Sequence, residues 1–177
     1  FGFVAPDATT LAYVQGRPFA PTGADFERAA AHWASLHTDP AARFDRDLSL
    51  NAASVAPTVT WGTSPEHAIA IDQKIPDPAQ DAVNRGPWQA ALDYMGLRAG
   101  HAIAGTPIDL AFIGSCTNSR LSDLRSAAAV LRGRRVAAGV RAWVVPGSVS
   151  VKTAAEAEGL DRVFIDAGCE WREPGCS

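Results

Sequence analysis

An α/β fold with a parallel sheet is predicted for the C-terminal half of this sequence, with a loop-rich α+β segment before it. Two observations predict this fold. From residue 108 onward, short apolar runs alternate with amphipathic stretches of helical length. Gly133 and Gly159 close those stretches, as glycine does at many helix ends. Because strands that alternate with helices form βαβ units, we expect a three-layer arrangement, a parallel sheet with helices on its faces.

The elements before residue 108 are less regular. Residues 24–37, ADFERAAAHWASLH, predict a helix because their apolar side chains recur at helical spacing. Residues 44–72 are extended in character, and residues 73–86 form a connector rich in Pro and Asp. A short helix is expected over 87–97, with Pro87 in its first turn.

Five regular elements follow. They are a strand at 108–114 (IDLAFIG), a helix at 119–133, a strand at 140–147 (VRAWVVPG), a helix at 148–159 and a strand at 162–168 (RVFIDAG). We therefore divide the chain into residues 1–85, a loop-rich segment with its connector that belongs to a neighbouring domain, and residues 86–177, an α/β domain.

Composition excludes several classes of partner. The formal net charge is −3, and no basic stripe favours a nucleic acid. No apolar run approaches the roughly 20 residues that span a bilayer, so we expect no membrane contact. Three cysteines make an odd count, which favours thiols kept reduced in the cytoplasm over a closed disulfide framework.

Two of these cysteines lie in loops that the predicted topology places at one edge of the sheet. Cys116 follows the first strand, and Cys176 lies in the segment after the last one. Loops that leave the carboxyl ends of parallel strands share one edge, where such folds bind ligands. A helix N-terminus lowers a thiol pKa, so Cys116 suits metal binding or reaction; the alternative is a small buried residue in a tight turn. Cys169 is interpreted as packing.

Other patterns are weaker. Ser148 and Lys152 lie where an anion could bind at a helix N-terminus, although Ser148 as a plain helix cap fits equally well. A zinc site built from the cysteines with His67 or His101 lacks paired ligand spacing.

Several strings together resemble one family. They are FIGSCTNSRLSDLRSAA, VVPGS, AEAEGLDRVFIDAG and EWREPGCS, with APDATTLAYVQGRPFAP and VTWGTSPEHAIAIDQKIPDP earlier in the chain. They resemble the large subunits of isopropylmalate isomerases (3-isopropylmalate dehydratases), iron–sulfur hydro-lyases of the aconitase family. The resemblance extends over nearly the whole chain and implies an aconitase-like fold, with residues 86–177 as the cluster-binding domain.

The resemblance implies a 4Fe-4S cluster held by three cysteines, with Cys116 as the first ligand and Cys176 as the second. The third would lie three positions after Cys176, so the chain is expected to be a late segment that stops before it, with its α/β domain incomplete. Thr117, Asn118 and Ser119 flank the first ligand and could hydrogen-bond to cluster sulfides or substrate, as could Ser148; Asn118 and Ser119 as helix caps are the alternative.

The implied activity is the isomerisation of 2-isopropylmalate and 3-isopropylmalate in leucine biosynthesis, by a large subunit that works with a separate small subunit. The substrate class is a 2-hydroxy dicarboxylic acid. Catalytic groups are expected outside this segment, and the 177 residues alone are expected to be inactive. Two alternatives stay open: a homoaconitase-like or other aconitase-family hydro-lyase, and a metal-free scaffold or assembly fragment.

Overall fold

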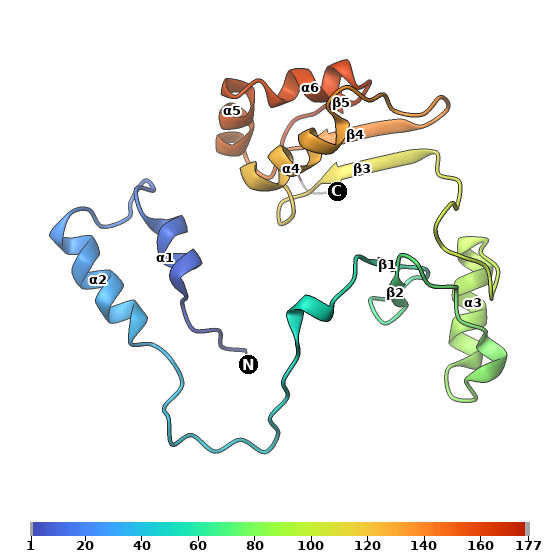
Figure 1. Cartoon of the computed structure of the whole chain (residues 1–177), viewed down its shortest axis with the longest axis horizontal. Helices are drawn as coiled ribbons and strands as arrows, with labels where there is room; N and C mark the ends of the chain where they lie inside the picture. Colours follow the sequence, from blue (N-terminus) through green and yellow to red (C-terminus); the bar gives the residue numbers. More distant parts are fainter. Residues whose placement is uncertain (1, 176–177) are drawn as a thin grey trace. The chain divides into compact units, whose positions relative to one another are not determined.

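The computed structural model describes residues 2–175, so Cys176 lies outside the described residues. The chain forms two compact units, Phe1–Ser54 and Val55–Ser177. Figure 1 shows the elements of both. This division does not test the predicted domain boundary at residue 85, which stays a prediction.

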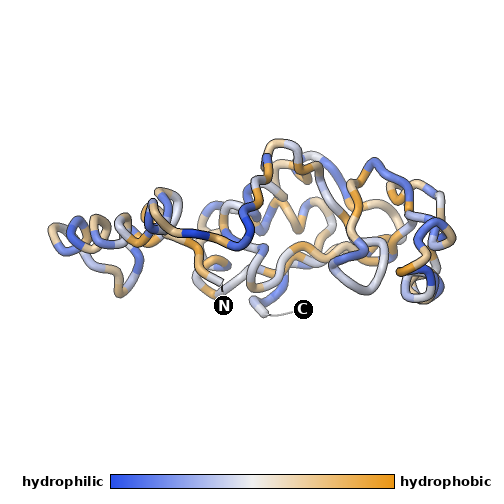
Figure 2. Tube along the Cα trace, turned by 90° about the horizontal axis from the view of Figure 1, so that it is seen from below, coloured by the Kyte–Doolittle hydropathy of each residue, from blue (hydrophilic) through white to orange (hydrophobic). Residues whose placement is uncertain are grey.

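The first unit holds two helices and no buried residue. Helix α1 (Ala8–Val14) begins at Asp7, whose carboxylate accepts the Thr10 N–H at 2.7 Å. Helix α2 (Ala24–Ala34) confirms the helix expected over 24–37, and a short 3-10 turn, η1 (Ala52–Ser54), ends the unit. Figure 2 shows hydrophilic and hydrophobic residues alternating along these helices. None of residues 2–54 is buried.

The second unit begins with a small hydrophobic core. An antiparallel pair, β1 (Thr58–Thr60) and β2 (Ala68–Ala70), is followed by a 3-10 turn, η2 (Pro78–Gln80), and by helix α3 (Arg85–Met95). The buried side chains of this core come from α3 (Ala91 and Leu92) and from the connecting loops (Trp61, Ile75 and Ile103). The helix predicted over 87–97 is therefore confirmed, with left-handed Gly96 at its C-cap.

A parallel sheet follows, as the alternating pattern predicts. Its strands are β3 (Leu110–Gly114), β4 (Arg141–Val145) and β5 (Glu170–Trp171), in that spatial order. Between them lie helices α4 (Leu121–Leu131), α5 (Val149–Ala157) and α6 (Leu160–Asp166). Both strand pairs are parallel.

One face of the sheet is covered by all three helices. Alternate residues of β3 and β4, such as Ala111 and Val144, point into a core with Leu124 of α4, Ala155 of α5 and Phe164 of α6. The residues between them, such as Phe112 and Trp143, point to the other face, as the pleat requires. Within residues 55–175, the helices that pack against the sheet, α4, α5 and α6, all belong to the core on the first face. The predicted three-layer arrangement is not confirmed, because the packing described within residues 55–175 places helices on one face of the sheet.

The strand predicted at 162–168 is wrong. Residues 160–166 form helix α6, and the third strand is the two-residue β5 that follows it. Leu160 and Phe164 are buried together with Ala167, at the i, i+4, i+7 spacing of a helix face. The run VFID matched a buried strand because it is short and apolar, a pattern that periodicity alone does not distinguish from a helix.

Candidate functional site

The loop after β3 presents Cys116 at the carboxyl edge of the sheet. Gly114 has φ 135°, and a Cβ there would lie 2.1 Å from the Val145 carbonyl oxygen, so only glycine fits. Ser115 has φ 97°, which is rare for a residue with a side chain and costs about 1–3 kcal/mol. These two residues turn the chain out of the sheet and leave Cys116 exposed. The alternative of a buried cysteine in a tight turn is therefore not observed.

The loops after β3 and β4 are joined through Gly147. Its N–H donates to the Ser119 carbonyl at 3.0 Å, and a Cβ at Gly147 would lie 2.9 Å from that oxygen and 3.5 Å from the Cys116 carbonyl oxygen. The adjoining Pro146 is fully buried. The backbone around Cys116 is thus fixed by the neighbouring loop, which is what a ligand-bearing segment requires.

Three polar side chains beside Cys116 were predicted to take part in the site. The Thr117 hydroxyl lies 3.7 Å from the Cys116 sulfur, within reach of a hydrogen bond. Asn118 is exposed. Ser119 is 1 % exposed, and its hydroxyl meets no hydrogen-bond partner among the described residues. Such an unsatisfied buried group in a folded protein requires an explanation.

The helix caps differ from the expectation at one of two positions. Asn118 and Ser119 do not cap α4, because Arg120 is its N-cap and donates its N–H to the Asp123 carboxylate at 3.0 Å. Ser148 does cap α5, accepting the Val151 N–H at 3.2 Å. The helix-cap interpretation of Ser148 is therefore confirmed, and its predicted role near a cluster stays a prediction.

The segment after β5 reaches the same edge of the sheet. Its first residue, Arg172, donates its N–H to the Val144 carbonyl at 3.0 Å. Glu173 forms an ion pair with Lys152 of α5, and this carboxylate is the largest influence that raises the pKa of Lys152. The Lys152 ammonium is thus paired with a carboxylate of the chain itself, so its charge does not require a bound anionic ligand. A Cβ added to Gly175 would meet only open space.

Cys169 differs from Cys116 in every respect that matters for metal binding. It precedes β5, belongs to the core under the helices and is 6 % exposed. Burial raises the pKa of its thiol, which disfavours the thiolate that a metal needs. The structure accords with the interpretation of Cys169 as a packing residue.

An aromatic surface with charged residues around it occupies the open face of the sheet. Phe112 and Trp143 meet edge to face at 6.4 Å, and the Arg172 guanidinium lies 4.1 Å from the Trp143 ring centroid. The buried Trp143 indole N–H lies close to Glu170 without reaching hydrogen-bond geometry, and with the Arg141 and Arg172 guanidiniums it lowers the pKa of Glu170. A cavity of about 560 Å³ is lined by Phe112, Trp143, Glu170 and Arg172, among others, and reaches Gly175.

One described side chain, the Cys116 thiol, is the kind of donor that an iron–sulfur cluster requires. Within residues 2–175, no three His, Cys, Asp or Glu side chains are grouped closely enough to hold a metal ion. Cys116 is nevertheless an exposed thiol on a fixed loop with a hydroxyl beside it. The predicted role of Cys176 lies outside the described residues.

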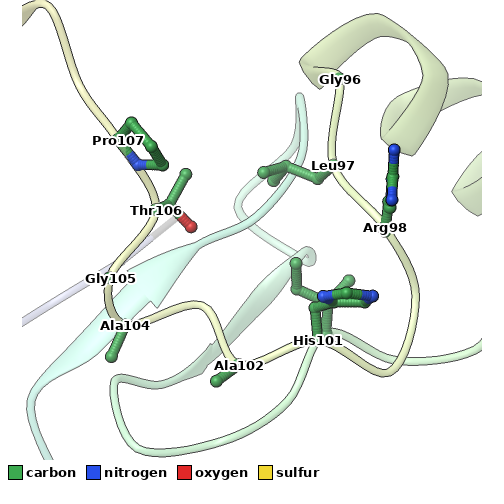
Figure 3. Close-up of a pocket in the computed structure, with 10 residues that line it drawn as sticks. Gly96, Leu97, Arg98, His101, Ala102, Ala104, Gly105, Thr106 and Pro107 are labelled. Carbon is green, nitrogen blue, oxygen red and sulfur yellow. The ribbon is translucent and has the colours of Figure 1, made fainter.

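A second cavity, of about 360 Å³, lies in the part of the chain around α3. Arg98 and His101 lie on one side of it, and Thr106 and Pro107 lie on the other (Figure 3). His67 is not among its lining residues. That side chain is buried and stacks on Trp61, and its Nδ1 accepts the Thr63 N–H at 3.1 Å. The imidazole thus supplies a partner for one backbone N–H of the loop at residues 60–65.

Residues 110–171 thus form a parallel α/β domain, and Cys116 is exposed in the loop at the carboxyl end of its first strand. The model of the aconitase family (aconitate hydratase) matches residues 1–177, and the chain belongs to this family. It is 60% identical over 178 residues to the 3-isopropylmalate dehydratase large subunit 1 of Bradyrhizobium diazoefficiens, covering 99% of this chain and 37% of that protein. It is also 60% identical to the 3-isopropylmalate dehydratase large subunit of Cupriavidus necator, covering 99% of this chain and 67% of that protein.

The chain thus spans little more than a third of the length of the first relative. Among the described residues, no helix is both long enough and apolar enough to cross a membrane.

Proposed function

We propose that this chain forms part of the large subunit of a 3-isopropylmalate dehydratase, a hydro-lyase that interconverts 2-isopropylmalate and 3-isopropylmalate in leucine biosynthesis. The observation that supports the proposal most is an exposed cysteine on a fixed loop, in a chain 60% identical to proteins of that name. The name "large subunit" implies a small-subunit partner, which we propose for this chain as well.

The thiolates of Cys116 and Cys176 would hold a 4Fe-4S cluster at the sheet edge, with a third thiolate from outside these residues. When bound, the cluster supplies a Lewis acid to the hydroxyl and carboxylate of the substrate. The Thr117 hydroxyl, 3.7 Å from the Cys116 sulfur, would donate to that thiolate and orient it. Ser119 brings a buried hydroxyl without a described partner to the same loop.

Asn118 and Ser148 are proposed to face the substrate side of this edge, and no catalytic base is assigned within the chain. A cytoplasmic location, and the absence of nucleic-acid and membrane partners, stay predictions from the cysteine count and the charge.

The test is anaerobic reconstitution of the full-length protein with iron, sulfide and its small subunit, followed by turnover of isopropylmalate and of homocitrate-type acids. We expect a charge-transfer absorbance and faster turnover of isopropylmalate. Faster turnover of the homocitrate-type acid would favour a homoaconitase-like enzyme instead. A protein that takes up no cluster would leave the metal-free scaffold as the better account.

A further inference from the structure

The segment that leads to Cys176 has very little strand to hold it. Strand β5 consists of two residues, and after Arg172 the chain leaves the sheet. A cluster ligand must nevertheless be held in place, because the metal site depends on the position of each thiolate. Contacts outside the sheet ladder therefore matter more here than at Cys116, whose loop is fixed by Gly147.

Four side chains supply such contacts, and we call them the Lys152 network: Lys152, Glu156, Trp171 and Glu173. Lys152 forms an ion pair with Glu173 and lies 3.7 Å from the Glu156 carboxylate. Glu156 also accepts the Trp171 indole N–H at 2.9 Å. Two residues of α5 thus bind two residues of the C-terminal segment, on either side of Arg172.

The network is anchored in the core at its Trp171 end. The Trp171 ring stacks on the fully buried Phe164 ring with their centroids 5.7 Å apart and their planes 8° apart. The Lys152 side chain is 17% exposed, whereas that of Glu173 is 83% exposed. Lys152 is therefore the ordered partner, and Glu173 is the group that it holds.

We infer that Lys152 is a positioning residue for the Cys176 thiolate, acting through Glu173, which lies three residues before that cysteine. The inference rests on the proposed function, because it takes Cys176 to be a cluster ligand. In this account the Lys152 network replaces the missing ladder hydrogen bonds and keeps the segment at the sheet edge when the cluster is lost or inserted.

The experiment compares variants of the full-length protein after anaerobic reconstitution with iron and sulfide. Lys152→Met removes the charge and keeps the apolar stem. Glu173→Gln removes the other charge at an exposed position, where damage to the fold is not expected. We expect both to lose the charge-transfer absorbance roughly 10-fold faster in air than the wild type, the lower end of the effect of outer contacts on metal sites. Lys152→Arg should restore the wild-type rate.

The matched control is Arg125→Met. It breaks another ion pair between a helix and a distant segment, Arg125 with Glu158, which lies away from the segment after β5. We expect Arg125→Met to keep the wild-type rate of cluster loss. The EPR spectrum of the reduced cluster should broaden in Lys152→Met and in Glu173→Gln but not in Arg125→Met, because a less fixed thiolate gives the iron a wider range of environments.

The outcomes separate this inference from the proposed function. A wild-type protein without a cluster overturns both. A wild-type protein with a cluster, together with Lys152→Met and Glu173→Gln variants that lose it no faster than Arg125→Met, overturns the positioning role alone.

Discussion

Residues 1–54 and the α/β part from β3 onward both contain amphipathic helices, yet only the second part builds a core. Helix α2 has its Phe26 and Trp33 rings in edge contact, but neither ring is buried. Helices α4, α5 and α6 bury Leu124, Ala155 and Phe164 completely. The difference is the sheet: parallel crossovers bring three helices onto one face, whereas residues 2–54 contain no strand on which α2 could pack. Amphipathic periodicity predicts a helix, and the topology decides what it packs against.

The largest effect should separate these two parts. Replacing Phe164 by Ala removes a fully buried ring from the core and should lower the free energy of unfolding by about 3–5 kcal/mol. The matched Phe26→Ala change in α2 should cost clearly less, because that ring is only partly buried and its contact with Trp33 lies outside any buried core. Urea denaturation followed by circular dichroism measures both. Equal losses would show that α2 contributes to a core of the same kind.

The next effect concerns the turn that exposes Cys116. Gly114→Ala combines a φ of 135° with a Cβ placed 2.1 Å from the Val145 carbonyl oxygen, and should cost about 2–3 kcal/mol. Gly139 also has a positive φ, but a Cβ there meets nothing within 4 Å, so Gly139→Ala should cost about 1 kcal/mol. The same denaturation experiment applies. A Gly114→Ala loss no larger than that of Gly139→Ala would contradict the close approach of β3 to β4.

The two described cysteines should differ in reactivity. Labelling of the metal-free protein with iodoacetamide, read peptide by peptide in a mass spectrometer, should modify Cys169 at least about 10-fold more slowly than Cys116. Because burial raises the pKa of Cys169 above the ordinary 9.0, its labelling rate should still rise with pH beyond that value. Similar rates for both thiols would place Cys169 at the surface.

The smallest effect is expected from an exposed ion pair. The Arg125 guanidinium donates to Glu158 at 2.8 Å and lowers the pKa of that carboxyl. A folded-state pKa below the ordinary 4.5 means that the pair stabilises the fold above that pH and ceases to do so as the pH falls through the lower value. Arg125→Met should therefore lower the urea midpoint slightly at neutral pH.

That difference should vanish in acid. Arg28→Met, which breaks an exposed pair within one helix, should change the midpoint less, since it joins no separate elements. A loss for Arg125→Met that persists unchanged in acid would rule out the ion pair as its cause.

The sequence predicts much of this structure and misses one element for a physical reason. The spacing of apolar residues and the closing glycines predict strands β3 and β4 and the helices that follow them. The same pattern predicts that Cys116 lies at the carboxyl edge of the sheet, and the structure confirms this position. The run VFID predicts a strand where helix α6 forms, because a short apolar run fits either element. The helical spacing becomes visible only when Leu160 and Ala167 are included with Phe164, and both lie outside the run VFID.

Parts of the candidate site depend on contacts that no single segment of sequence contains. The ion pair of Lys152 with Glu173 joins residues 21 positions apart, and the approach of Gly147 to Ser119 depends on where two loops meet. The helix N-caps differ in the same way. The sequence predicts Ser148 as the N-cap of α5, because serine is a common capping residue. It does not predict Arg120 as the N-cap of α4, because there the Asp123 carboxylate binds the Arg120 backbone N–H.

The most direct test of the account is the iron content of three single variants of the full-length protein, Cys116→Ser, Cys176→Ser and Cys169→Ser, after anaerobic reconstitution. We predict that the first two lose the charge-transfer absorbance and most of their iron, whereas Cys169→Ser keeps both, because its thiol is buried in the core and not at the sheet edge. Loss of the cluster in Cys169→Ser, with retention in Cys116→Ser, would contradict the assignment of the ligand edge.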